Sequence, residues 1–281
     1  MFRCAKHLET RTLTAVLERL LVEPGTPARL GERDPRDDLG LEKSVGEKRL
    51  RELSEKLGEL QYRLFAESER AVLLVLQGLD ASGKDGVVRR VFKGVNPTGV
   101  KVVSFRAPVG AEREHDYLWR VHAALPARGE VGVFNRSHYE DVVAVRMREL
   151  APEESWRRRP GHIREFERML IDEGTTVVKV FLTISREQQA ARFRERIDDP
   201  TKRWKFRAED LEVGERFDDW VGAWDDVITE TSTAHAPWYV VPADRNWVKA
   251  LAVATLLVET LERLDPRFPP PEPGIEDLQV A

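Results

Sequence analysis

Short apolar runs separated by amphipathic stretches make up the chain from Arg70 onward. The apolar runs are rich in Val, Ile and Leu, as in strands buried on both faces of a parallel sheet. They predict strands at 71–77, 100–105, 130–137, 175–184 and 237–243. The intervening stretches predict helices starting at Lys84 and over 112–125, 162–174, 185–197, 207–231 and 247–264. This alternation predicts an α/β fold of three layers, α/β/α, with a central parallel sheet.

The two ends of the chain have different patterns. Leucines at three- and four-residue steps predict an amphipathic helix over 44–68: Leu50, Leu53, Leu57, Leu60 and Leu64. Residues 1–43 are dense in Pro, Gly and charge, which predicts a loop-rich arm with one short helix. Residues 265–281 form a proline-rich tail, expected to be extended or disordered. The predicted domain therefore covers 44–264, and no function is predicted for residues 1–36.

Composition and charge narrow the function classes. The net charge is −4, so nucleic acid is not an expected partner. No apolar run approaches the ~20 residues of a membrane span, and the charged N-terminus does not resemble a signal peptide. A single cysteine, Cys4, excludes a disulfide framework, so a cytoplasmic location is expected. Residues 185–207, with six Arg and two Lys against four acids, indicate a focused anion site.

The sequence GLDASGKDG follows the first strand and opens the next helix. It matches the phosphate-binding pattern G-x-x-x-x-G-K, in which backbone N–H groups and the helix N-terminus surround phosphate oxygens. Lys84 is predicted to contact the transferred phosphoryl group. The expected phosphate-binding positions around it are Gly78, Ala81, Ser82, Gly83 and Gly86. The alternative is a glycine turn that only joins a strand to a helix.

Two carboxylates depart from the usual form of this loop. Asp85 stands where a Ser or Thr hydroxyl normally holds Mg²⁺, and Asp80 lies inside the loop. A carboxylate is a suitable hard ligand for Mg²⁺, so Asp80 is the predicted replacement. Asp85 is either a further ligand or a helix-start residue favoured by the macrodipole.

The third predicted strand ends in NRSHYED. Ligands of open α/β sheets bind beyond the carboxyl ends of the strands, where Asn135 and Arg136 emerge. The Arg136 guanidinium suits phosphate oxygens, although a surface ion pair is the alternative. His138 and Tyr139 are expected to pack or orient rather than to react.

The segment AARFRERIDDPTKRWKF predicts a basic lid at about 185–215. Arg192 and Arg196 lie four residues apart on one helical face, and Arg203 and Lys205 follow in a loop. Closing such a lid over phosphates supplies positive charge and excludes water. The alternative is a solvated charged helix. Two aromatic residues are expected to anchor the lid when it closes, Trp204 and Phe206.

Taken together, GLDASGKDG, FNRSHYEDV and DDPTKRWKF resemble the second family of polyphosphate kinases, particularly its class III. The resemblance runs from about Asp37 to Leu264. It implies a P-loop kinase fold similar to thymidylate kinase, with a helical lid and a basic channel. It also implies phosphoryl transfer between inorganic polyphosphate and AMP, ADP or ATP, with Mg²⁺ as cofactor and Mn²⁺ as the alternative ion. Homo-oligomers are common in the family, so one is expected.

The resemblance also assigns roles by motif position. Asp80 and Lys84 keep the metal and phosphate roles, and Arg136 is similar to the arginine beside the transferred phosphate. Arg192, Arg196 and Arg203 resemble phosphate clamps of the lid. Other classes have Asp at the position of Asn135, and this departure suggests Asp141 as the second Mg²⁺ ligand. Glu140 is then expected near the nucleotide, where it helps to admit AMP.

The implied mechanism is an in-line transfer without a covalent enzyme intermediate, dominated by positioning and electrostatics. Three other functions are compatible with parts of the pattern. An ATP-dependent nucleoside monophosphate kinase shares the loop and lid. A GTPase switch is disfavoured because no N-K-x-D motif occurs. A non-catalytic polyphosphate-binding protein would keep its binding after Lys84→Ala.

Overall fold

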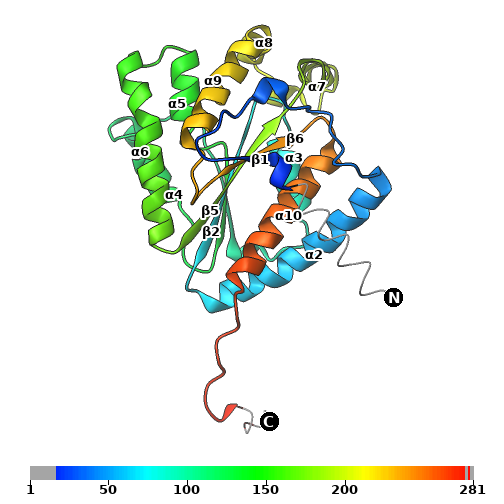
Figure 1. Ribbon diagram of the computed structural model, residues 1–281, viewed down its shortest axis with the longest axis vertical. Coiled ribbons are helices and arrows are strands. Elements are labelled where there is room, and N and C mark those ends of the chain that lie inside the picture. Colours follow the sequence, from blue (N-terminus) through cyan, green and yellow to red (C-terminus); the bar gives the residue numbers. More distant parts are fainter. Residues whose placement is uncertain (1–16, 276–277, 279–281) are drawn as a thin grey trace.

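The computed structural model describes residues 17–275 and residue 278, and its centre is a six-stranded sheet (Figure 1). The strand order is β1-β6-β5-β2-β4-β3. The strands are β1 (Leu21–Val22), β2 (Ala71–Gly78), β3 (Val100–Ser104), β4 (Val131–Asn135), β5 (Thr175–Thr183) and β6 (Trp238–Pro242). All neighbouring pairs are parallel except β1 with β6. The α/β prediction is confirmed.

Helices cover both faces of the sheet (Figure 1). The first group lies on one face: α2 (Lys43–Glu67), α3 (Lys84–Val91) and α10 (Asn246–Leu264). The second group lies on the other: α4 (Trp119–Ala124), α5 (Glu140–Met147), α6 (Glu153–Asp172) and α9 (Phe217–Thr231). The predicted lid segment forms α7 (Arg186–Asp198) and α8 (Glu209–Glu215). No helix among the described residues is long and apolar enough to cross a membrane.

Strand β2 lies in the centre of the sheet and is buried along its whole length. Alternate side chains enter opposite layers, as the two-residue repeat of a strand requires. Leu74 and Leu76 pack in the layer of α2 and α10, whereas Leu73 and Val75 pack in the layer of α6 and α9. Burial on both faces explains the continuous apolar run from which the strand was predicted.

Three predicted elements are wrong in extent, and one strand was not predicted. The helix expected at 112–125 is confined to α4, because Asp116 accepts a hydrogen bond from Leu118 N at 2.9 Å and starts the helix late. The helix expected at 207–231 is divided at Arg216, whose backbone leaves the α region (φ −96°, ψ 30°). Helix α6 begins earlier than expected and continues through Pro160.

The unpredicted strand is β1, which belongs to the N-terminal arm and pairs antiparallel with β6. It contains two residues, too few for any periodicity to appear in the sequence.

The strand order gathers four connections at one edge of the sheet. Strands β4 and β5 flank β2, and β6 lies beyond β5. Because these pairs are all parallel, the carboxyl ends of the four strands lie at the same edge of the sheet. The register pairs Leu76 with Asn135 and Gly78 with Leu182. The segments following β2, β4, β5 and β6 therefore meet at the position where ligands of open α/β sheets bind.

Candidate active site

The connection from β2 to α3, residues 78–84, forms the phosphate loop of the site. Ala81 has φ 64° and Gly83 has φ 95°, and α3 begins at Lys84. Glycine suits position 83, because its φ of 95° strains any residue with a side chain, and a Cβ there would also crowd Lys249 Nζ. The strand before the loop and the helix after it give the structural context that phosphate-binding loops need.

Lys84 is buried at the start of α3, and its ammonium group bends back over the loop. Nζ donates to Gly78 O at 2.6 Å and to Leu79 O at 3.3 Å. Burial, together with the neighbouring Arg136, lowers the pKa of Lys84 to about 8. These carbonyl contacts hold the amine inside the loop, and its predicted phosphate contact stays a prediction.

Asp80 and Arg136 form an ion pair that joins the phosphate loop to the segment after β4. Arg136 has φ 63°, and its backbone N–H donates to Leu76 O at 3.1 Å, which fixes it beside the end of β2. Burial opposes ionisation of Asp80, but Arg136 and Lys84 outweigh it and lower the pKa of this carboxyl. Glu140 Oε2 lies 3.9 Å from Arg136 Nη1, and burial raises the pKa of Glu140 despite Arg136. Asp80, Arg136 and Glu140, which the sequence predicts to belong to one site, therefore lie close together at the phosphate loop.

Asp85 has a clear partner. Asn135 Nδ2 donates to Asp85 Oδ1 at 2.6 Å, which ties the first turn of α3 to the end of β4. Asp85 lies in the first turn of α3, and both roles considered for it, further ligand or helix-start residue, stay predictions. Asn135, from the neighbouring strand, is thereby held over the loop.

Asp141 lies in the first turn of α5 and is held by two arginines. Arg120 Nη2 donates to Asp141 Oδ2 at 3.0 Å, and Arg159 donates to the Asp141 carbonyl oxygen. Across residues 17–275, no group of three or more His, Cys, Asp and Glu side chains is arranged to hold a metal ion. The joint metal role of Asp80 and Asp141 stays a prediction.

The donor set around the loop nevertheless fits a hard divalent cation. Mg²⁺ is usually bound by one or two carboxylates, with substrate phosphates and water completing the octahedron. Asp80 supplies a carboxylate inside the phosphate loop, and the low pKa of this group keeps it ionised. A complete protein cage is therefore not required for a metal that arrives with phosphate.

The predicted lid residues differ in their contacts. Arg192 donates to four backbone carbonyls, and Arg196 Nη1 lies 3.6 Å from Asp210 Oδ2 of α8. Arg203 and Lys205 are exposed, so their side chains are accessible to a ligand. Their predicted phosphate contacts, like those of Arg192 and Arg196, stay predictions.

The two aromatic residues of the lid also differ. Phe206 packs edge-on against Phe193, with ring centroids 5.8 Å apart. Trp204 is 75% exposed and makes no such anchor here, although its Nε1 donates to Thr201 O at 3.0 Å.

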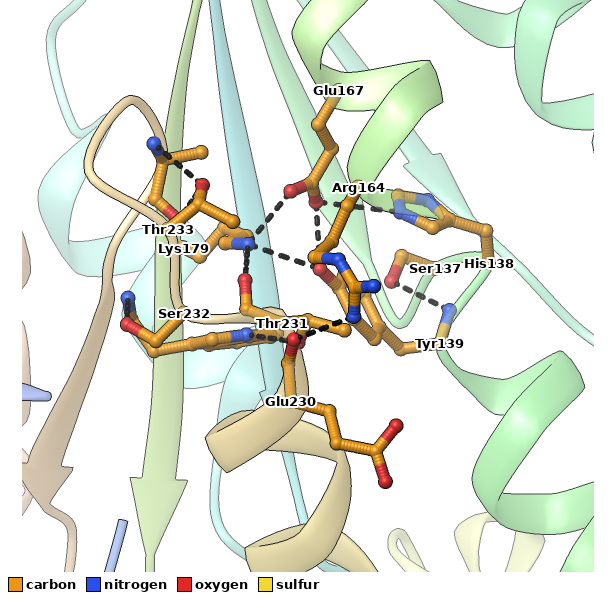
Figure 2. A network of polar contacts seen from close by, with 12 residues as sticks. Ser137, His138, Tyr139, Arg164, Glu167, Lys179, Glu230, Thr231, Ser232 and Thr233 are labelled. Atoms are coloured by element: carbon orange, nitrogen blue, oxygen red, sulfur yellow. Dashed lines mark hydrogen bonds and ion pairs between the residues drawn. The ribbon is translucent and has the colours of Figure 1, made fainter. Parts of the chain in front are cut away.

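A buried network supports the turn between Arg136 and Glu140. Figure 2 shows Tyr139, Glu167, Lys179 and Thr231 pointing toward one another. Tyr139 Oη donates to Glu167 Oε1 at 2.7 Å, and Lys179 Nζ donates to Glu167 Oε2 at 2.6 Å and to Thr231 O at 2.7 Å. His138 Nε2 lies 3.6 Å from Glu167 Oε1. Both His138 and Tyr139 are buried, in agreement with the packing role predicted for them.

The site contains three residues that the sequence analysis missed. Gln189 Nε2 donates to Asp80 O at 3.0 Å, Asp210 pairs with Arg196, and Lys249 contacts the phosphate loop. Only Lys249 leaves a signal in the sequence, because it interrupts the apolar run from Trp247 to Ala254 in α10.

Comparison with known proteins identifies the family that shares this arrangement. The family model described as Polyphosphate kinase 2 (PPK2) matches residues 40–269, most of the chain. The chain belongs to the polyphosphate kinase 2 family. It is therefore a phosphotransferase, and its fold is the P-loop kinase fold of that family.

Individual members of the polyphosphate kinase 2 family are similar over nearly the full length. An AMP/ADP-polyphosphate phosphotransferase of Meiothermus ruber is 48% identical over 266 residues, covering 94% of this chain and 100% of the relative. An ADP-polyphosphate phosphotransferase of Rhodopseudomonas palustris is 43% identical, covering 80% and 82%. The crystal structure of Polyphosphate Kinase 2 from Arthrobacter aurescens TC1 superposes with a TM-score of 0.87 at 38% identity, covering 94% and 93%.

Proposed function

We propose that this protein transfers phosphoryl groups from inorganic polyphosphate to AMP and ADP, reversibly and with Mg²⁺. The observation that carries the proposal is the convergence of Lys84, Asp80 and Arg136 on the phosphate loop. The similar proteins from Meiothermus ruber and Rhodopseudomonas palustris, an AMP/ADP- and an ADP-polyphosphate phosphotransferase, suggest the substrates. A basic lid segment beside the loop suits a donor that carries many negative charges.

The proposed roles of the active-site residues follow from their charges and their positions around the phosphate loop. The terminal phosphate oxygen of the nucleotide attacks the terminal phosphorus of polyphosphate in line, and the shortened polyphosphate leaves with the bridging oxygen. The attacking oxygen is largely ionised near neutral pH, so a strong general base is dispensable. The protein instead aligns two polyanions and offsets their charge.

Lys84 is placed to move from the carbonyls of Gly78 and Leu79 to the transferred phosphoryl group. Arg136, at the edge of the same loop, would contact oxygens of that group. Asp80 would hold Mg²⁺ with Asp141 as second ligand, and the ion would neutralise phosphate charge when bound. Arg196, Arg203 and Lys205 would contact the phosphate chain when the lid closes, and Glu140 would lie near the nucleotide.

The deciding experiment gives the purified protein AMP, Mg²⁺ and long-chain polyphosphate and follows ADP and ATP by chromatography. A second arm replaces polyphosphate with ATP. We expect ADP and then ATP in the first arm without added ATP. Product only in the second arm would indicate an ATP-dependent nucleoside monophosphate kinase and contradict the proposal.

We also propose a homo-oligomer acting in the cytoplasm, in keeping with the family resemblance and the single cysteine. Light scattering of the purified protein measures the molar mass. A mass near 32.2 kDa, the value of one chain, would contradict the oligomer.

A further inference from the structure

Two cationic side chains contact the carbonyl side of the phosphate loop. Lys249, from α10, donates through Nζ to Ser82 O at 2.6 Å and to Ala243 O at 3.1 Å. Arg192, from α7, donates through Nη1 to Ala81 O at 2.8 Å and to Ser82 O at 3.1 Å. The same guanidinium donates through Nη2 to the carbonyls of Ala243 and Asp244 at 2.9 and 2.7 Å. Together they connect the loop to the segment that follows β6.

Lys249 is a completely buried lysine whose hydrogen bonds go to carbonyl oxygens rather than to a carboxylate. Its side chain is 0% exposed, in a helix whose neighbouring buried residues are apolar. In the described part of the chain it forms no ion pair, and carbonyl oxygens accept both of its hydrogen bonds. Burial and the nearby Arg192 lower its pKa to about 7. Burying an amine without an ion pair is costly, so its position against the phosphate loop points to a function other than stability.

The geometry of the phosphate loop indicates what Lys249 does. Backbone N–H groups converge on an anion only when the carbonyl groups of the same peptides turn away from it. Those carbonyls are then buried behind the loop and require donors. Ala81 and Gly83, with positive φ, produce this turn, and Lys249 and Arg192 supply the donors at Ala81 and Ser82. The ammonium end of Lys249 also lies against Gly83, so a Cβ at position 83 would displace it.

The contacts extend from the loop to the base of the lid. Asp244 accepts hydrogen bonds from Ser185 N at 2.9 Å and from Ser185 Oγ at 2.7 Å. Ser185 caps α7, the helix that carries Arg192. The segment after β6 thus joins the lid helix and the phosphate loop through one set of hydrogen bonds.

We propose that Lys249, acting with Arg192, is a positioning residue that holds the phosphate loop with its N–H groups turned toward the phosphate site before substrate binds. The proposal rests on the proposed function in that the loop binds phosphate. Lys249 acts through the backbone of Ser82 and Gly83 and does not itself contact the substrate.

The test compares Lys249→Met with the matched control Lys101→Met. Lys101 also donates to a backbone carbonyl, Leu125 O at 2.9 Å. It lies near the amino end of edge strand β3, whereas the phosphate loop lies at the carboxyl ends of the strands. Three quantities are measured: kcat and KM for polyphosphate with AMP, the free energy of unfolding, and hydrogen exchange at amides 80–84 in the substrate-free protein. Arg192→Lys is an independent second variant, because it keeps the charge but loses the fork that spans several carbonyls.

For Lys249→Met we expect kcat/KM for polyphosphate to fall about 10- to 100-fold, the effect of losing hydrogen bonds from a charged donor. Exchange at amides 80–84 should rise by a similar factor, without a loss of global stability at pH 7. Arg192→Lys should shift both quantities the same way, and Lys101→Met should change neither.

Wild-type kinetics and wild-type loop exchange in a folded Lys249→Met protein would overturn the proposal. If that variant does not fold, the same two readouts in Arg192→Lys decide. Absence of polyphosphate turnover in the wild type would remove the proposed function, whereas the loop exchange would still test the positioning role.

Discussion

Two completely buried lysines, Lys179 and Lys249, lie in different surroundings. Lys179 donates to a carboxylate, a carbonyl and a phenol oxygen, so its charge is balanced within a closed network (Figure 2). Lys249 donates only to carbonyls, beside the phosphate loop. Both pKa values are lowered, first by burial; Glu167, a direct hydrogen-bond partner, opposes the shift for Lys179, and the nearby Asp244 opposes it for Lys249.

The comparison distinguishes a lysine with a structural role, Lys179, from one that we propose serves a ligand site, Lys249. The ion pair of Lys179 with Glu167 joins β5 to α6 and supports Tyr139, next to the active-site turn. Because the charges of Lys179 and Glu167 cancel, the pair contributes little electrostatic potential at the active site. Lys249 has no ion pair in the described part of the chain and lies behind a loop that is predicted to bind anions. Pairing, rather than burial, therefore distinguishes the two roles.

Breaking the paired lysine should have the largest effect. Lys179→Met leaves Glu167 buried and unpaired, so we expect the free energy of unfolding to fall by about 3–5 kcal/mol. The double variant Lys179→Met/Glu167→Leu removes both charges and should recover most of that loss. Urea denaturation of the three proteins measures it. A double variant as unstable as the single one would show that the pair does not act as a unit.

Asp80→Asn removes a charge at the phosphate loop, where we expect the effect to fall on turnover rather than on stability. Removing this carboxylate should lower kcat at least ~10²-fold, or ~2.7 kcal/mol in the barrier, as expected for lost electrostatic stabilisation. The free energy of unfolding should change far less. Asp172→Asn, an exposed partner of Arg168 on α6, is the matched control. Wild-type turnover in Asp80→Asn would remove its assigned role.

The pH dependence of stability sharpens the contrast at Lys249. Its folded pKa, about 7, lies below the ordinary value of 10.5, so between these pH values the unfolded chain binds a proton that the folded protein does not. The free energy of unfolding therefore rises with pH in this window. From pH 7 to pH 9, wild type should gain about 2 kcal/mol relative to Lys249→Met, at up to ~1.4 kcal/mol per pH unit. Parallel pH curves would contradict an unpaired lysine.

The smallest effect is expected for Tyr139→Phe. The phenol oxygen donates to Glu167 at 2.7 Å and accepts from Lys179 at 3.1 Å, while the ring packs on Trp238. Loss of the hydroxyl should cost about 1–2 kcal/mol of unfolding free energy, because the ring contacts remain. Thermal denaturation measures this, and a loss as large as that of Lys179→Met would indicate that Tyr139 is the centre of the network.

The features predicted from the sequence are those with a local or periodic cause. Apolar runs predicted the five parallel strands, and the glycine pattern placed the phosphate loop between β2 and α3. Because parallel strands end at one edge, the same reasoning brought Arg136 to Asp80. These predictions needed no knowledge of which helices pack together.

The missed features depend on contacts between distant segments. Lys249 lies 167 residues from Ser82, and only the packing of α10 beside α3 brings them together. The spacing of Arg192 and Arg196 predicted a shared helical face but not that Arg192 would meet carbonyl groups. The two-residue strand β1 likewise depends on pairing with β6.

The central claim is that the phosphate loop of this protein transfers phosphoryl groups from polyphosphate. Its most direct test is the initial rate of ADP formation from AMP, Mg²⁺ and polyphosphate, without added ATP, in wild type and in Lys84→Ala. We predict turnover by wild type and a loss of at least ~10²-fold in the folded variant. No product from wild type, or equal rates in both proteins, would contradict the claim.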